Sequence, residues 1–102
     1  MNFGLFLMPS HPPERNRYDA AQWDLDVIQW ADQLGFSEVW IGEHFSSPWE
    51  PVPSPDLIIA QALQRTERIK LAPGLICCHT IIQSNWPTVL PTLTIWRKED
   101  LC

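Results

Sequence analysis

Two ionisable side chains, Glu43 and His44, directly follow a short apolar run. The run, Val39 to Ile41, is too short for a helix and consists of β-branched and aromatic residues, so it predicts a buried strand that stops at Gly42. Enzymes with α/β folds keep their chemistry where such strands end. A neutral imidazole titrates near neutral pH and can move a proton there. We therefore interpret His44 as a candidate catalytic residue, with Glu43 either orienting it or supporting the strand end. The structural alternative is a strand-end histidine bonded to a backbone carbonyl.

Two further side chains could line a pocket at the same edge. His11 lies in a proline-containing loop after the first apolar run, and Trp49 lies in the loop that follows His44. Either can belong to a substrate pocket. The alternatives are a solvated loop histidine and an aromatic that only shields the loop from solvent. Trp40, inside the predicted strand, is interpreted as core rather than as a cofactor contact.

The cysteines give no support for a metal centre. Cys77 and Cys78 are adjacent, a spacing that suits neither a metal knuckle nor an easy mutual disulfide, although His79 follows them. We predict no metal site.

The elements that must position these residues alternate along the chain. Residues 3–8 predict a buried strand, and residues 19–34 predict a helix that ends at Gly35. The apolar residues of that helix recur at steps of three or four: Ala20, Trp23, Val27, Ala31 and Leu34. Asp24 and Asp26 are interpreted as favourable charges near its N-terminus. Together with the strand before His44, this pattern predicts a βαβ unit with parallel strands.

A second helix and a third strand follow. Ser54, Pro55 and Asp56 are typical of a helix start, as N-cap, first helical residue and dipole-facing charge. That helix extends to about Arg65, and residues 67–72 predict a short strand closed by Pro73 and Gly74. The first 74 residues therefore predict a β-α-β-α-β order.

Composition limits the function. The chain has 102 residues, 45% of them hydrophobic and 19% charged, which indicates one globular domain. Its net charge of −5 argues against nucleic acid or an anionic membrane as a partner. It has neither an apolar segment of about 20 residues nor the basic start of a signal peptide. We expect a cytoplasmic protein.

The composition changes at Leu75. Residues 75–102 contain no Ala and no Gly, yet hold all three cysteines and four of the five threonines. No helical or strand period continues there. We therefore divide the chain into residues 1–74 and an irregular tail, residues 75–102.

The first part resembles the bacterial luciferase-like, flavin-dependent monooxygenases, particularly their limonene monooxygenase-like members. The resemblance rests on three segments in the family's order: F-G-L-F-L-M-P-S-H-P-P at residues 3–13, W-A-D-Q-L-G-F-S-E-V-W-I-G-E-H-F at residues 30–45, and S-P-D-L-I-I-A-Q-A-L-Q-R-T-E-R-I-K-L-A-P-G at residues 54–74. It implies the N-terminal β-α-β-α-β portion of a (β/α)8 TIM barrel, truncated after the third strand.

The resemblance also implies a chemistry. Family members bind reduced FMN, supplied by a flavin reductase, and react it with molecular oxygen to oxidise a small organic substrate. A histidine in the matching E-H turn lies by the flavin and is implicated in catalysis, which makes His44 a tentative flavin-proximal residue. Some relatives have a second histidine where this chain has Phe45. A deazaflavin-dependent hydride transferase on the same fold remains an alternative.

The chain itself also admits a non-catalytic interpretation, as a truncated product or a small interaction protein. Phosphate groups typically bind the late loops of such barrels, near strands 7 and 8, and this chain reaches only strand 3. No glycine-rich phosphate loop replaces them. We therefore expect the isolated chain to bind no FMN and to lack activity.

The tail has a genetic interpretation. Read one base earlier with permitted codons, residues 75–80 become A-H-L-L-P-Y, and a family-like reading continues to residue 102. We hypothesise that one base is missing in the codon for Gly74 and that the tail is out-of-frame translation.

Overall fold

The computed structural model describes residues 1–44, 47–50, 52 and 54–74. Three strands and two helices alternate along them: β1 (Gly4–Leu7), α1 (Arg17–Gln33), β2 (Glu38–Ile41), α2 (Pro55–Ala62) and β3 (Lys70–Pro73). The predicted β-α-β-α-β order is confirmed. The predicted tail lies outside the described residues, and so does Phe45.

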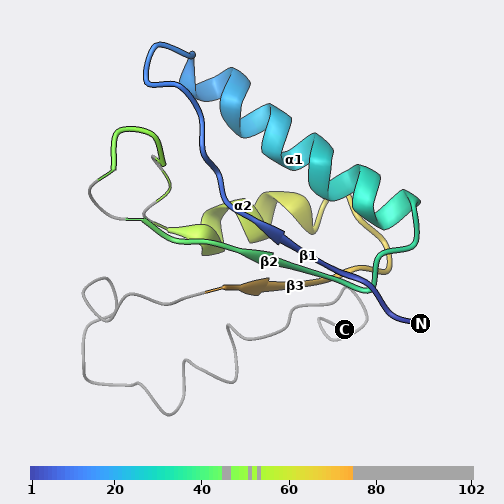
Figure 1. The fold of residues 1–102 in the computed structure, drawn as a ribbon. Helices are drawn as coiled ribbons and strands as arrows, with labels where there is room; N and C mark the ends of the chain where they lie inside the picture. The colour runs from blue at the N-terminus through green and yellow to red at the C-terminus, as the bar shows by residue number, and fades with distance from the viewer. Residues whose placement is uncertain (45–46, 51, 53, 75–102) are drawn as a thin grey trace, which may run out of the picture.

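The strands form one parallel sheet in the order β1-β2-β3. Leu5, Val39 and Leu71 are register partners across it, and Phe6, Trp40 and Ala72 form the next row. Both helices cover the same face of the sheet (Figure 1). All three strands therefore end at one edge, where the β1–α1 and β2–α2 loops begin.

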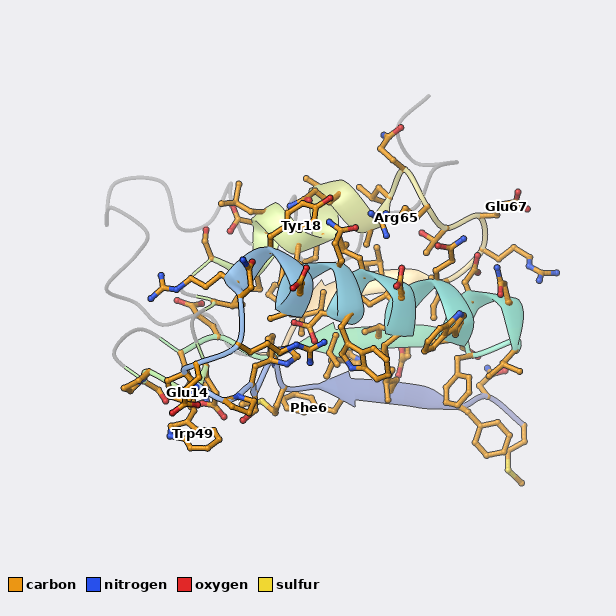
Figure 2. All side chains as sticks on the ribbon, turned by 90° about the horizontal axis from the view of Figure 1, so that it is seen from above. Phe6, Glu14, Tyr18, Trp49, Arg65 and Glu67 are labelled. Atoms are coloured by element: carbon orange, nitrogen blue, oxygen red, sulfur yellow. The ribbon has the colours of Figure 1, made fainter. Side chains whose placement is uncertain are left out.

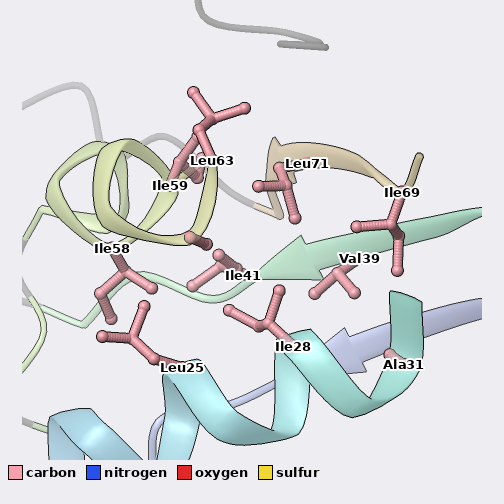
Figure 3. Close-up of a cluster of buried hydrophobic side chains, with 11 residues drawn as sticks. Leu25, Ile28, Ala31, Val39, Ile41, Ile58, Ile59, Leu63, Ile69 and Leu71 are labelled. Carbon is pink, nitrogen blue, oxygen red and sulfur yellow. The ribbon is translucent and has the colours of Figure 1, made fainter. Parts of the chain in front are cut away.

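The core lies between the helices and the sheet (Figure 3). It is built from aliphatic side chains of both helices and of the two strands β2 and β3, together with residues next to these elements: Leu25, Ile28, Ala31, Val39, Ile41, Ile58, Ile59, Ala62, Leu63, Ile69 and Leu71. Val39 and Ile41 are fully buried on this side. Because side chains alternate along a strand, Trp40 lies on the opposite face of the sheet, in one row with Phe6.

The predicted apolar stripe of α1 is only partly correct. Ala20 and Ala31 are buried, but Trp23 is 47% exposed and Leu34 is 77% exposed. The buried face is centred on Leu25 and Ile28 and includes two aspartates, Asp24 and Asp32. A pattern of apolar residues leaves this face out because the face contains two aspartates. Both can be buried because each has a specific hydrogen-bond partner.

The ends of α1 have identifiable causes. The side chain of Asn16 accepts a hydrogen bond from the backbone N–H of Tyr18 at 2.8 Å, an N-cap that the sequence prediction missed. At the other end, Gly35 has a φ of 86°, as its predicted capping role requires. The N–H groups of Gly35 and Phe36 donate to the carbonyls of Asp32 and Ala31, which completes a Schellman motif.

The start of β3 differs from its prediction. Residues 67–69 were expected to be strand, yet β3 begins at Lys70. The carboxylate of Asp32 accepts the backbone N–H groups of all three residues, Glu67, Arg68 and Ile69, at 2.8, 3.1 and 2.9 Å. The N–H groups of these residues are therefore bonded to a side chain of α1 rather than to a neighbouring strand.

In α2, Ser54 is the N-cap as predicted, but its hydroxyl donates to the side chain of Asp56 and not to the helix backbone.

Candidate functional site

The β1–α1 and β2–α2 loops lie together at the edge of the sheet where the strands end. The backbone N–H of His11 in the first loop donates to the carbonyl oxygen of Trp49 in the second, at 2.7 Å. Within the second loop, the N–H of His44 donates to the carbonyl oxygen of Val52 at 3.2 Å. Figure 2 shows Trp49 and Glu14 at this same end of the molecule. The loops that carry the candidate residues are thus joined through their backbones.

His44 is paired with a carboxylate from its own loop. Its Nδ1 lies 2.9 Å from Oε2 of Glu50, and the two side chains are 45% and 21% exposed. The sequence left two roles open for Glu43, orienting His44 or supporting the strand end, and both stay predictions. The carboxylate that the structure places beside the ring of His44 is that of Glu50, and Glu43 is buried. An imidazole held by a carboxylate is a common arrangement for proton transfer, because the carboxylate fixes the ring and its protonation pattern.

His11 is buried rather than solvated. Its Nε2 lies 3.0 Å from both carboxylate oxygens of Asp24, in the middle of the buried face of α1. Arg15 Nη1 lies 3.2 Å from Nδ1 of the same ring. Because a guanidinium can only donate, this contact requires Nδ1 to accept and places the ring proton on Nε2, which donates to Asp24.

Asp24 has an unusual electrostatic environment. Burial raises the pKa of its carboxyl above the ordinary value of 3.8, while hydrogen bonding and charge interactions with His11 and Arg15 act in the opposite direction. Asp24 therefore anchors the β1–α1 loop to α1, which corrects its interpretation as a charge on the helix dipole. Asp26 also has a partner elsewhere, because its Oδ1 accepts a bond from Arg65 at 3.2 Å.

A small hollow with a volume of about 90 Å³ opens beside the buried histidine. It is lined by residues of both loops and of α1: His11, Pro12, Pro13, Arg15, Arg17, Ala20 and Pro48. His11 is one of the lining residues, and its contact with a substrate stays a prediction. Trp49 is not among the lining residues, and 54% of it is exposed. Its place in a substrate pocket stays a prediction.

The face of the sheet away from the helices carries two large aromatic side chains. Phe6 is more than half exposed there, and Trp40 is partly buried. Glycines follow β2 and β3 because neighbouring side chains fill the space that a Cβ would need. A Cβ at Gly42 would collide with the sulfur of Met8, and one at Gly74 would lie 2.6 Å from Cε2 of Phe6. This face of the sheet thus carries two aromatic side chains in one register row, Phe6 and Trp40.

Glu50 and Asp24 are the two site residues that sequence reasoning missed. Glu50 lies six residues after His44 across a loop with several prolines, so no periodic spacing connects the pair. The sequence gives only a weak indication that Asp24 is buried, because it falls between the apolar positions of an amphipathic helix.

Among the described residues no cluster of three metal-ligating side chains occurs. Cys77, Cys78 and His79 lie outside them. No described helix is long and apolar enough to cross a membrane.

Comparison with known proteins places this fold in a class. The solved structures that it resembles are TIM-barrel-like monooxygenases. The oxygenating constituent of 3,6-diketocamphane monooxygenase from Pseudomonas putida, a type II Baeyer–Villiger monooxygenase solved in complex with FMN, matches with a TM-score of 0.67 and 37% identity. The match covers 72% of this chain and 20% of that one. The described residues therefore form the first β-α-β-α-β portion of such a barrel, as predicted.

Residues 1–81 match the luciferase-like monooxygenase family. The chain belongs to this family of flavin-dependent monooxygenases. It is 43% identical over 76 residues to limonene 1,2-monooxygenase from Rhodococcus erythropolis, which is 74% of this chain and 20% of the relative. It is 37% identical over 101 residues to 2,5-diketocamphane 1,2-monooxygenase 1 from Pseudomonas putida, which is 99% of this chain and 27% of the relative. The chain thus spans between a fifth and about a quarter of the length of these relatives.

Proposed function

We propose that this chain supplies the N-terminal part of the active site of an FMN-dependent monooxygenase that oxidises a small organic substrate with molecular oxygen. The observation that carries the proposal is the His44–Glu50 pair at the edge where the parallel strands of a luciferase-like fold end. In this proposal His44 moves a proton at the reacting group.

The described residues fit one part of the cofactor. FMN supplies the electrons that activate oxygen, and its ring system is flat and largely apolar. Phe6 and Trp40 are aromatic side chains on the face of the sheet away from the helices, and they would contact such a ring system. The phosphate end would depend on late loops of the barrel, which lie beyond the three strands described here. A flavin reductase would deliver the reduced cofactor.

A chimaera tests the proposal in a complete barrel. Residues 1–74 of this chain replace the matching segment of the FMN-bound diketocamphane relative, and binding of reduced FMN and oxygenation of the diketocamphane are measured. We expect FMN binding and turnover in the chimaera, and no saturable FMN binding by the isolated chain. His44→Ala should leave FMN affinity nearly unchanged but lower turnover by about 10²–10⁴-fold, the usual contribution of a positioned acid–base group.

Two outcomes would contradict the proposal. Full turnover of the His44→Ala chimaera would exclude proton transfer by His44. Binding of a deazaflavin in place of FMN, with hydride transfer and no oxygen uptake, would favour the hydride transferase instead. Glu14→Ala is a suitable control, because Glu14 is an exposed residue of the neighbouring loop.

A further inference from the structure

The acid that contacts His44 is itself held in place from two directions. The backbone N–H of Glu50 donates to the carbonyl of Ser47 at 3.3 Å, and the carbonyl of the preceding Trp49 accepts the N–H of His11. His11 is in turn fixed by Asp24 on the buried face of α1. The position of Glu50 is therefore set by a helix and by two loops rather than by its own loop alone.

The contact between Glu50 and His44 bears on where the ring proton of His44 lies. An ionised carboxylate can only accept, so the 2.9 Å ion-pair contact with Glu50 favours the tautomer of a neutral His44 that carries its proton on Nδ1. The lone pair is then on Nε2, the other ring nitrogen. His11 has the opposite arrangement, because Arg15 donates to its Nδ1 and Asp24 accepts from its Nε2. For neutral rings, the contacts of His44 and His11 therefore favour opposite tautomers.

We propose that Glu50 is the positioning residue of His44. It fixes the tautomer with the proton on Nδ1 and so makes Nε2 the atom that accepts a proton from the reacting group. When Nε2 takes that proton, the ring becomes a cation that the ionised carboxylate of Glu50 stabilises, and Nε2 later releases the proton to solvent, to which the 45% exposed side chain of His44 has access. The tautomer of His44 can be tested without any enzymatic activity. The proton-transfer step, in contrast, rests on the proposed function.

Nitrogen NMR of the 102-residue chain labelled with ¹⁵N-histidine tests the tautomer directly. We expect a protonated Nδ1 and a bare Nε2 for His44, with the reverse for His11 as an internal reference. The His44→Gln spectrum identifies the His44 signals. Glu50→Ala should move His44 toward the Nε2-protonated form, which is the commoner one for free histidine, and should leave His11 unchanged. Glu14→Ala removes an equal charge from the adjacent loop and should change neither ring.

The same spectra of the chimaera provide a second measurement if the variant chain unfolds. A bare Nδ1 in wild-type His44, or a His44 tautomer that Glu50→Ala leaves unchanged, would overturn the proposal. In the chimaera, Glu50→Gln should lower kcat by about 10- to 100-fold, less than the loss of His44 itself, with the KM for reduced FMN nearly unchanged. A failure of the proposed function gives a different result, because His44→Ala would then keep its turnover while the tautomers stay as described.

Discussion

The backbone N–H of His11 and the carbonyl oxygen of Trp49 lie 2.7 Å apart, and this bond joins the two loops that carry the candidate site. Because it involves only main-chain atoms, it constrains the position of the second loop whatever side chains occupy it. The ring of His11 contacts Asp24 of α1, so the same residue joins the second loop through its backbone and the helix through its side chain.

Asp24 should make the stability of the fold depend on pH in an unusual direction. Its folded-state pKa is raised above 3.8 by burial, so the folded chain binds this proton more tightly than the unfolded chain. The stabilising contribution is complete below about pH 3.8 and is lost as the pH rises through the raised value. We expect the free energy of unfolding of the wild type to fall across this window relative to Asp24→Asn. Urea unfolding of both proteins at several pH values measures the difference.

A second substitution separates the charge of Asp24 from its hydrogen bond. Asp24→Ala leaves the buried N–H of His11 without its acceptor and should cost about 1–3 kcal/mol near neutral pH. Asp19→Asn is a suitable control, since Asp19 is an exposed residue at the start of the same helix. Parallel pH profiles for wild type and Asp24→Asn would show that Asp24 is not responsible.

Asp32 should be a major determinant of how α2 connects to β3. Its two oxygens accept three successive backbone N–H groups, of which that of Ile69 belongs to a buried residue. Asp32→Ala should therefore lower the free energy of unfolding by about 2–4 kcal/mol, because one buried donor loses its partner and two others must turn to water. Amide hydrogen exchange at residues 67–69 should accelerate in the same variant. Asp32→Asn keeps one acceptor oxygen and should show an intermediate loss, whereas equal stability of all three proteins would contradict this role.

The elements of the fold were predictable because each has a strong local signal. The apolar runs before Pro9 and Gly42 are strands, and Gly35 ends α1 with a positive φ that other residues rarely adopt. The start of β3 was not predictable from residues 67–69 alone. Their sequence suits a strand, but a side chain more than thirty residues earlier, Asp32, accepts their N–H groups. Such long-range capping leaves no periodic trace in the sequence.

In each histidine–carboxylate pair of the candidate site, the sequence pointed to the histidine but not to its acidic partner. His44 and His11 were visible because histidines after strand ends suit chemistry, but their acidic partners were not. Glu50 contacts His44 although six residues separate them, and Asp24 contacts His11 although thirteen residues separate them. Both relationships depend on loop conformation, which residue spacing does not encode. The roles of His44, Glu43 and Trp49 in catalysis or binding stay predictions.

The change of composition at residue 75 leads to a genetic prediction. If one base is missing in the codon for Gly74, the tail is out-of-frame translation, and the DNA beyond it should encode the remaining strands and helices of a luciferase-like barrel in the shifted frame. The matches with relatives extend to different lengths, 76 residues for the limonene enzyme and 101 for the diketocamphane enzyme, so they leave the boundary at residue 74 open. Resequencing the DNA around codon 74 and translating the downstream region in all three frames checks the prediction. An unaltered codon 74, followed by DNA without a luciferase-like reading frame, would show that residues 75–102 are the genuine continuation of the chain.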